Sequence, residues 1–195
     1  MRAVRVEPHP DARVAMLEAL GDLGDSVALP AVLPIIDKAR GQEQSTAVAA
    51  AANFRSREAV PALMRVLRAG AESEPRVYAA RALSWIGGGD TLRALRGGLS
   101  DSDPAVRVEC LTGLQRMGDR KAVPQIVALL TDESAEVRAA SAQLLGVWER
   151  GDATMALTTR LDDPSAEVRQ AVIIALGAAG DRRAASPLTR FIQNE

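Results

Sequence analysis

The stretch from Val106 to Asp119 reads VRVECLTGLQRMGD, and related stretches occur six times in the chain of 195 residues. The six begin at residues 12, 44, 75, 106, 137 and 168, so neighbouring units are separated by 32, 31, 31, 31 and 31 residues. In each unit, apolar or small residues fall at offsets 0, 4, 7, 8 and 11 from the first position, which places them on one face of a helix. Each stretch is therefore predicted to form an amphipathic helix.

A turn and a second helix are predicted after each stretch. The turn is typified by Met117-Gly118-Asp119, in which glycine suits a left-handed helix end and aspartate suits the next helix start. The second helix has proline in or near its first turn, as in Ala122-Val123-Pro124, where a missing N–H matters least. Because one such helix pair cannot bury both of its faces, neighbouring pairs must stack. The sequence thus predicts an all-α fold, an α-solenoid of about six helical hairpins in a single domain over residues 1–195.

The combined pattern is Ala-Val-Pro-x-x-x-x-Leu-Leu-x-Asp, then Val-Arg-x-x-Ala, then Ala-Leu-Gly-x-x-Gly-Asp. It resembles HEAT repeats of the phycobilisome-lyase (PBS lyase) type over residues 10–193. The resemblance implies a right-handed superhelix, with the Val-Arg helices lining the concave face and the proline-bearing helices the convex face. Two units depart from the pattern: Gln44-Ser45 lacks the Val-Arg pair, and the turn at Trp148-Glu149-Arg150-Gly151-Asp152 comes two residues late. A local irregularity is expected there.

Composition and charge argue against several functional classes. The chain is 47% hydrophobic, and its 24 Lys and Arg residues nearly balance 25 Asp and Glu residues, so it offers no overall attraction for nucleic acid or anionic lipid. A lone cysteine, Cys110, and a lone histidine, His9, disfavour a disulfide framework, a multi-histidine metal site and histidine-based catalysis. We therefore expect no enzyme activity, no catalytic residue, no metal and no cofactor.

The chain contains no stretch long and apolar enough for a membrane span, and its first residues lack the apolar core of a signal peptide. The cytoplasm is therefore the expected compartment, and no membrane partner or small-molecule substrate is indicated.

Two recurrent features are interpreted as structural. Arginine recurs at offset 1 of most units, and Asp101, Asp132 and Asp163 each precede the first position of a unit by five residues. A ladder of Asp–Arg pairs that ties consecutive loops together explains this recurrence better than an anion-binding stripe. Cys110 and Trp148 fall at packing offsets and are expected to lie in the core.

The residues at offsets −1, 3, 6 and 10 point away from the packing face and should form the concave surface. Three of the five aromatic residues, Phe54, Tyr78 and Trp85, fall at these positions. The same positions carry eight acidic residues and two arginines, a formal charge of −6. A surface of that sign disfavours binding of phosphate groups.

The predicted function is a non-enzymatic scaffold or adaptor that binds a protein partner on the concave face. Trp85 is the expected anchor, because Trp, Tyr and Arg most often dominate interface energies. As an alternative, Trp85 folds back over neighbouring repeats, and Arg81 or Arg116 stacks on its indole as a cation–π pair. The candidate surface consists of Phe54, Tyr78, Arg81, Trp85, Glu109, Thr112 and Arg116.

Other functions stay open at this point. Repeats of this type also occur in phycobilin lyases, so the resemblance implies handling of a tetrapyrrole chromophore as the alternative function. Nucleic-acid binding is less favoured and would use the convex arginines Arg57, Arg65, Arg68, Arg93 and Arg96. A di-iron hydroxylase, another activity of HEAT-like repeats, needs several His-Glu pairs and is excluded by the single His9.

Overall fold

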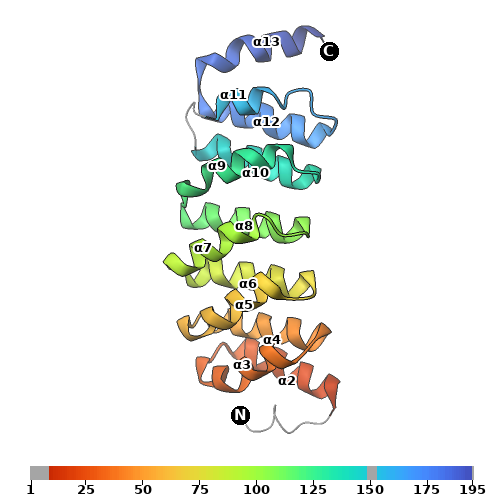
Figure 1. Cartoon of the computed structure of the whole chain (residues 1–195), viewed down its shortest axis with the longest axis vertical. Coiled ribbons are helices and arrows are strands. Elements are labelled where there is room, and N and C mark those ends of the chain that lie inside the picture. Colours follow the sequence, from red (N-terminus) through yellow and green to blue (C-terminus); the bar gives the residue numbers. More distant parts are fainter. Residues whose placement is uncertain (1–8, 149–152, 195) are drawn as a thin grey trace. The chain divides into compact units, whose positions relative to one another are not determined.

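The computed structural model describes residues 9–148 and 153–194, and every regular element within these ranges is helical (Figure 1). The described residues contain twelve α-helices and five short 3-10 helices, which confirms the predicted all-α solenoid of stacked helical hairpins. The chain divides into two compact units, residues 1–117 and residues 118–195. The expectation of a single domain over residues 1–195 stays a prediction.

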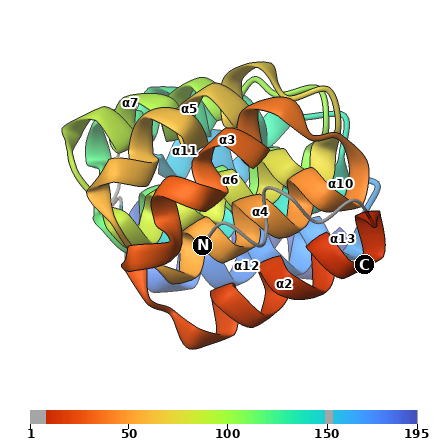
Figure 2. The same cartoon turned by 90° about the horizontal axis from the view of Figure 1, so that it is seen from below.

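The first unit consists of two layers of helices. Helices α2, α4, α6 and α8 contact one another in succession and form the even-numbered layer, while α3, α5 and α7 form the odd-numbered layer against them. Figure 2 shows α3, α5 and α7 on one side of α2, α4 and α6. The bounds are α2 (Pro10–Leu23), α3 (Leu29–Lys38), α4 (Gly41–Asn53), α5 (Val60–Ala69), α6 (Ser73–Ile86), α7 (Gly89–Gly98) and α8 (Pro104–Met117).

The second unit repeats this arrangement with fewer helices. Its main contact joins α10 to α12, and α11 packs against α12 from the odd-numbered side. The bounds are α9 (Val123–Ala128), α10 (Ala135–Trp148), α11 (Thr154–Thr158), α12 (Ala166–Ala179) and α13 (Ala185–Asn194).

Glycine, aspartate and proline act at the helix ends as predicted. Gly24 ends α2 with a φ of 65°, in the left-handed region that glycine adopts without steric cost. The Asp25 carboxylate then accepts a hydrogen bond from the N–H two residues later. Gly180 and Asp181 repeat both features after α12. Pro61 lies in the first turn of α5, where its missing N–H leaves no helical bond unmade.

The predicted Asp–Arg ladder is present in both units. The Arg76 guanidinium donates to the two carboxylate oxygens of Asp101 at 2.9 and 2.8 Å, and to the Gly70 carbonyl at 2.9 Å. Arg138 makes the equivalent pair with Asp163, with both hydrogen bonds at 2.8 Å. The hydrogen bond from Arg138 lowers the pKa of Asp163. These arginines therefore join consecutive repeats and are not free to bind an external anion.

The hydrophobic core lies between the two layers of each unit. Cys110 is fully buried and Trp148 is nearly so, which confirms both as core residues. Burial raises the pKa of the Cys110 thiol, so the side chain stays protonated and unreactive.

The second repeat begins one residue earlier than the sequence interpretation placed it. Gln44 occupies the position that arginine holds in the other repeats, and its Nε2 donates to the Ile36 carbonyl at 2.8 Å. This bond replaces the one that Arg76 makes to Gly70. The buried residues of α4 then match those of α6 with a constant separation: Ala47, Val48, Ala50 and Ala51 against Ala79, Ala80, Ala82 and Leu83. The irregularity expected in this repeat is thus a shift of the first position from 44 to 43. The late turn expected after Trp148 falls on residues 149–152, which lie outside the described ranges.

Candidate functional site

The exposed face of the even-numbered layer in the first unit centres on Trp85. This residue lies in the last turn of α6, and 52% of its surface remains accessible to solvent. Two arginines from the neighbouring repeats approach its indole, Arg116 from α8 and Arg55 from the end of α4. The site is therefore built from three consecutive repeats.

The Arg116 guanidinium stacks closely on Trp85. Its Cζ lies 3.6 Å from the centroid of the indole ring. Its Nη1 donates to the Ser84 Oγ at 2.9 Å, and that hydroxyl donates in turn to the Arg81 carbonyl at 2.7 Å. Arg116 thus stacks on Trp85 as a cation–π pair, the arrangement expected if Trp85 has a structural role. The stack nevertheless leaves half of Trp85 exposed to solvent.

Arg55 supplies a second cation that the sequence did not reveal. Its Cζ lies 5.3 Å from the centroid of the Trp85 ring. Its backbone has a φ of 48°, the one positive value of a non-glycine residue in the described part of the chain. The left-handed region is disfavoured for a side chain of this size, but here it closes the helix end: the Arg55 N–H donates to the Ala52 carbonyl, as the Gly24 N–H donates to the Gly21 carbonyl after α2. The repeat places Arg55 at the position that Gly24 and Gly180 hold at the ends of their helices, so only the residue type there departs from the pattern.

Tyr78 and Arg81 lie on α6, the helix that carries Trp85. The Arg81 Cζ is 6.0 Å from the centroid of the Tyr78 ring, and its Nη2 donates to the Glu109 Oε2 on α8 at 2.9 Å. This hydrogen bond raises the pKa of Arg81. Thr112 is exposed, and its hydroxyl donates to a carbonyl of its own helix.

Phe54 does not belong to this surface. The sequence interpretation placed its ring beside Trp85, but the structure buries it to 7% exposure. The one-residue shift of the second repeat explains the difference, because Phe54 takes the packing offset 11 and the exposed Asn53 takes offset 10. Phe54 therefore fills the core, as Trp148 does in the fifth repeat.

Two of the acids that the sequence placed on the exposed face do not offer free charge near Trp85. The shift also removes Glu43 from the exposed row, where it is replaced by Gln42, and Glu43 instead pairs with Arg13 at 2.6 Å. Glu109, the acidic residue on α8 that the sequence placed on this surface, forms an ion pair with Arg81. Within residues 9–148 and 153–194, no carboxylate pairs with Arg55 or Arg116. The two cations at the indole are thus not neutralised by a direct ion pair.

Other kinds of site find little support in the described residues. These residues contain no group of three or more His, Cys, Asp or Glu side chains arranged to hold a metal ion. The helices of residues 9–148 and 153–194 include none with the length and apolar character that a bilayer crossing requires. On the odd-numbered layer, Arg65 is bound by Asp37 and Arg93 is bound by Asp90.

A family model for HEAT repeats matches residues 92–154 and 124–195, which together span more than half of the chain. The chain belongs to the HEAT-repeat family. A search of curated proteins found no match for this HEAT-repeat protein.

Solved structures of other repeat proteins share its fold. An engineered protein aligns with a TM-score of 0.57 and 19% identity, covering 92% of this chain and 95% of its own. A designed armadillo repeat protein aligns with a TM-score of 0.52 and 20% identity, covering 91% of this chain and 98% of its own. Human deoxyhypusine hydroxylase in complex with glycerol aligns with a TM-score of 0.54 and 24% identity, covering 92% of this chain and 74% of its own. At these identities the likeness concerns the fold alone.

Proposed function

We propose that this HEAT-repeat protein is a non-enzymatic interaction module that binds a partner protein on the exposed face of α4, α6 and α8. The observation that carries the proposal is the half-exposed Trp85 held between Arg55 and Arg116. Tryptophan and arginine are the side chains most enriched among residues that dominate binding energy. The HEAT-repeat fold supports the proposal, because solenoids present extended surfaces to partners.

The geometry also suggests why Trp85 would contribute strongly to binding. Its indole is held in place by Arg116, whose own guanidinium is fixed by Ser84. A side chain that is already ordered loses little conformational entropy when a partner covers it. The remaining exposed half of the ring would then be desolvated by the partner, which adds favourable apolar burial.

The test compares proteins captured by matched baits. The baits are the wild type, Trp85→Ala, Arg116→Glu and Val147→Ala. Val147 occupies the offset of Trp85 in the fifth repeat and is 63% exposed, so it controls for loss of an exposed apolar side chain. Quantitative mass spectrometry of native lysate should reveal a protein retained by the wild type and by Val147→Ala but lost by both variants of the site. Identical capture by all four baits would contradict the proposal.

Chromophore handling is the second candidate, carried by the resemblance of the repeats to the PBS lyase type. Cys110 would not carry the tetrapyrrole itself, because it is buried and its thiol pKa is raised. Visible absorbance of the purified protein after incubation with a linear tetrapyrrole tests this candidate. A bound chromophore would favour it over a purely structural module.

Nucleic-acid binding is weakened by the pairing of the convex arginines. Arg65 forms an ion pair with Asp37, and Arg93 forms one with Asp90. These pairs reduce the positive potential that would attract phosphate groups. A salt-dependent mobility shift of DNA or RNA would support this function, and absence of a shift at low salt would reject it. The hydroxylase activity of one structural neighbour is not carried over, since the chain holds a single histidine.

A further inference from the structure

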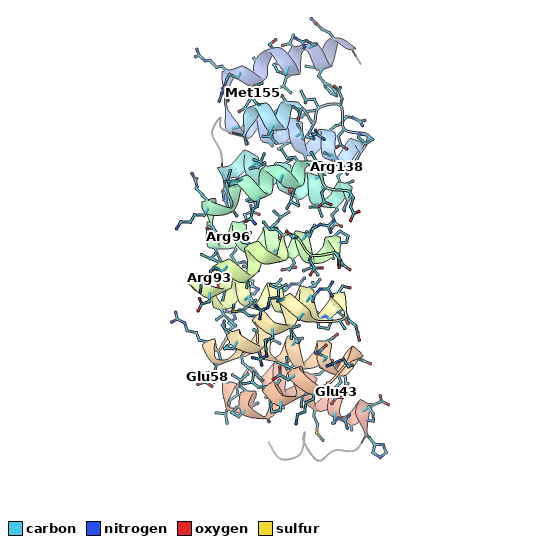
Figure 3. The ribbon with its side chains drawn as sticks, in the orientation of Figure 1. Glu43, Glu58, Arg93, Arg96, Arg138 and Met155 are labelled. Atoms are coloured by element: carbon cyan, nitrogen blue, oxygen red, sulfur yellow. The ribbon has the colours of Figure 1, made fainter. Side chains whose placement is uncertain are left out.

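A groove runs between α5 and α7 on the odd-numbered layer of the first unit. Its volume is about 660 Å³, within the range of pockets that hold small molecules. Its apolar walls come from both helices: Val60, Met64, Leu67 and Ala94. Figure 3 shows the side chains of Arg93 and Arg96 projecting from α7, the helix that forms one wall.

Two consecutive glycines at the end of α7 account for the open space. A Cβ added at Gly97 would meet no atom within 4 Å, so this position leaves the groove unfilled. A Cβ added at Gly98 would lie 2.4 Å from the Cys110 Sγ, so only glycine lets α7 approach α8 there. Ala94, one turn earlier, adds only a methyl group to the wall. The groove is thus encoded by missing side chains on α7.

The charges that line the groove leave one cation unmatched. The lining Asp101 is bound by Arg76 from outside the groove, and two of the three lining arginines, Arg65 and Arg93, are neutralised by their own ion pairs. Arg68, in the last turn of α5, is exposed and has no carboxylate partner within the described ranges. The groove therefore combines an apolar interior with one uncompensated guanidinium at its rim.

We propose that the α5–α7 groove binds an amphiphilic monoanion, a small molecule with an apolar body and one carboxylate or sulfonate group. The apolar body would lie over Met64, Ala94 and Gly97, and the anionic group would pair with Arg68. A nucleic acid or other polyanion fits poorly, because the remaining arginines are already neutralised and the walls are apolar. This site is separate from the surface around Trp85, so either proposal can fail without the other.

The probe is 1-anilinonaphthalene-8-sulfonate, a fluorescent amphiphile with one negative charge, titrated into the full chain. We expect saturable binding at one site per chain. Decanoate should displace the probe, whereas decyltrimethylammonium, with the same chain length and opposite charge, should not. Equal displacement by both competitors, or no saturable binding of the probe or of decanoate, would overturn the proposal.

Two pairs of variants locate the site. Gly97→Leu fills the groove and should weaken probe binding about tenfold or more. Its control is Gly177→Leu, since Gly177 is also exposed on a helix with no atom within 4 Å of an added Cβ. Arg68→Glu should weaken binding about fivefold or more, while Arg57→Glu, which changes the net charge equally outside the groove, should not. Circular dichroism melts establish that each variant is folded, and unchanged binding by folded Gly97→Leu or Arg68→Glu would overturn the assignment.

Discussion

Arg116 of one repeat stacks on Trp85 of the preceding repeat, with 3.6 Å between the guanidinium Cζ and the centroid of the indole. The contact orders both side chains without hiding the tryptophan, which remains 52% exposed. An exposed cation–π pair contributes only about 0.5–1 kcal/mol to stability, far less than full burial of an indole would. The stack therefore explains how Trp85 is positioned, and it leaves an apolar surface available for a partner.

Phe54→Ala should destabilise the fold strongly, by about 3 kcal/mol or more, because the ring is buried and its loss leaves a cavity. Asn53→Ala, one residue earlier and exposed, should change the free energy of unfolding by less than about 0.5 kcal/mol. Urea denaturation of both variants checks the corrected register. A small effect of Phe54→Ala, comparable to that of Asn53→Ala, would restore the register that the sequence suggested.

Gly98→Ala should destabilise the first unit by about 1–3 kcal/mol, because the added Cβ would lie 2.4 Å from the Cys110 Sγ. Combining it with Cys110→Ala should recover part of that loss, since the smaller side chain makes room for the methyl group. Gly97→Ala is the matched control and should be neutral or slightly stabilising, as Ala favours helix over Gly. Thermal melts of the wild type, Gly98→Ala, Cys110→Ala and the double variant form a double-mutant cycle. Strictly additive changes in the free energy of unfolding would show that residues 98 and 110 do not contact each other.

Arg138→Ala should cost about 3 kcal/mol, because it leaves the Asp163 carboxylate buried without its partner. The exposed pair provides the comparison, since Arg65→Ala removes the partner of Asp37 at the surface and should cost less than about 1 kcal/mol. Chemical denaturation at neutral pH measures both. Equal costs would mean that the ladder contributes no more than a surface ion pair.

The same pair predicts a dependence of stability on pH. The hydrogen bond from Arg138 lowers the pKa of Asp163 below its usual value of about 3.9. The stabilisation is therefore fully present above that value and is lost as the pH falls through the lower pKa of the folded state. Asp163→Asn should show a smaller loss of stability than the wild type between about pH 4 and pH 2. Parallel acid-denaturation curves for the two proteins would contradict this assignment.

The repeat architecture could be predicted from sequence because each element carries its own local signal. The Gly24-Asp25 turn, the proline at the start of α5 and the Asp101 carboxylate opposite Arg76 all recur at fixed spacing. Such signals depend on residue type alone, so the helices, turns and ladder follow from the chain without any tertiary information.

The candidate site was only partly predictable, for two physical reasons. Helix α4 is rich in alanine and has Gln44 in place of arginine, so small side chains fit either of two neighbouring registers and Phe54 was assigned to the wrong face. Arg55 reaches Trp85 from the left-handed position at a helix end where other repeats carry glycine, so the repeat pattern gave no sign of a cation there. Tyr78, Arg81, Trp85 and Arg116 were placed on one surface because they lie in repeats whose register is marked by arginine.

The most direct test of the central claim is the affinity of Trp85→Ala for a partner that the wild type captures, measured by titration calorimetry together with the melting temperature. The account predicts a loss of about 2 kcal/mol or more, roughly 30-fold in Kd, with the melting temperature lowered by no more than a few degrees. Val147→Ala should bind as the wild type does. Unchanged affinity of Trp85→Ala with a markedly lowered melting temperature would contradict the claim and make Trp85 a structural residue.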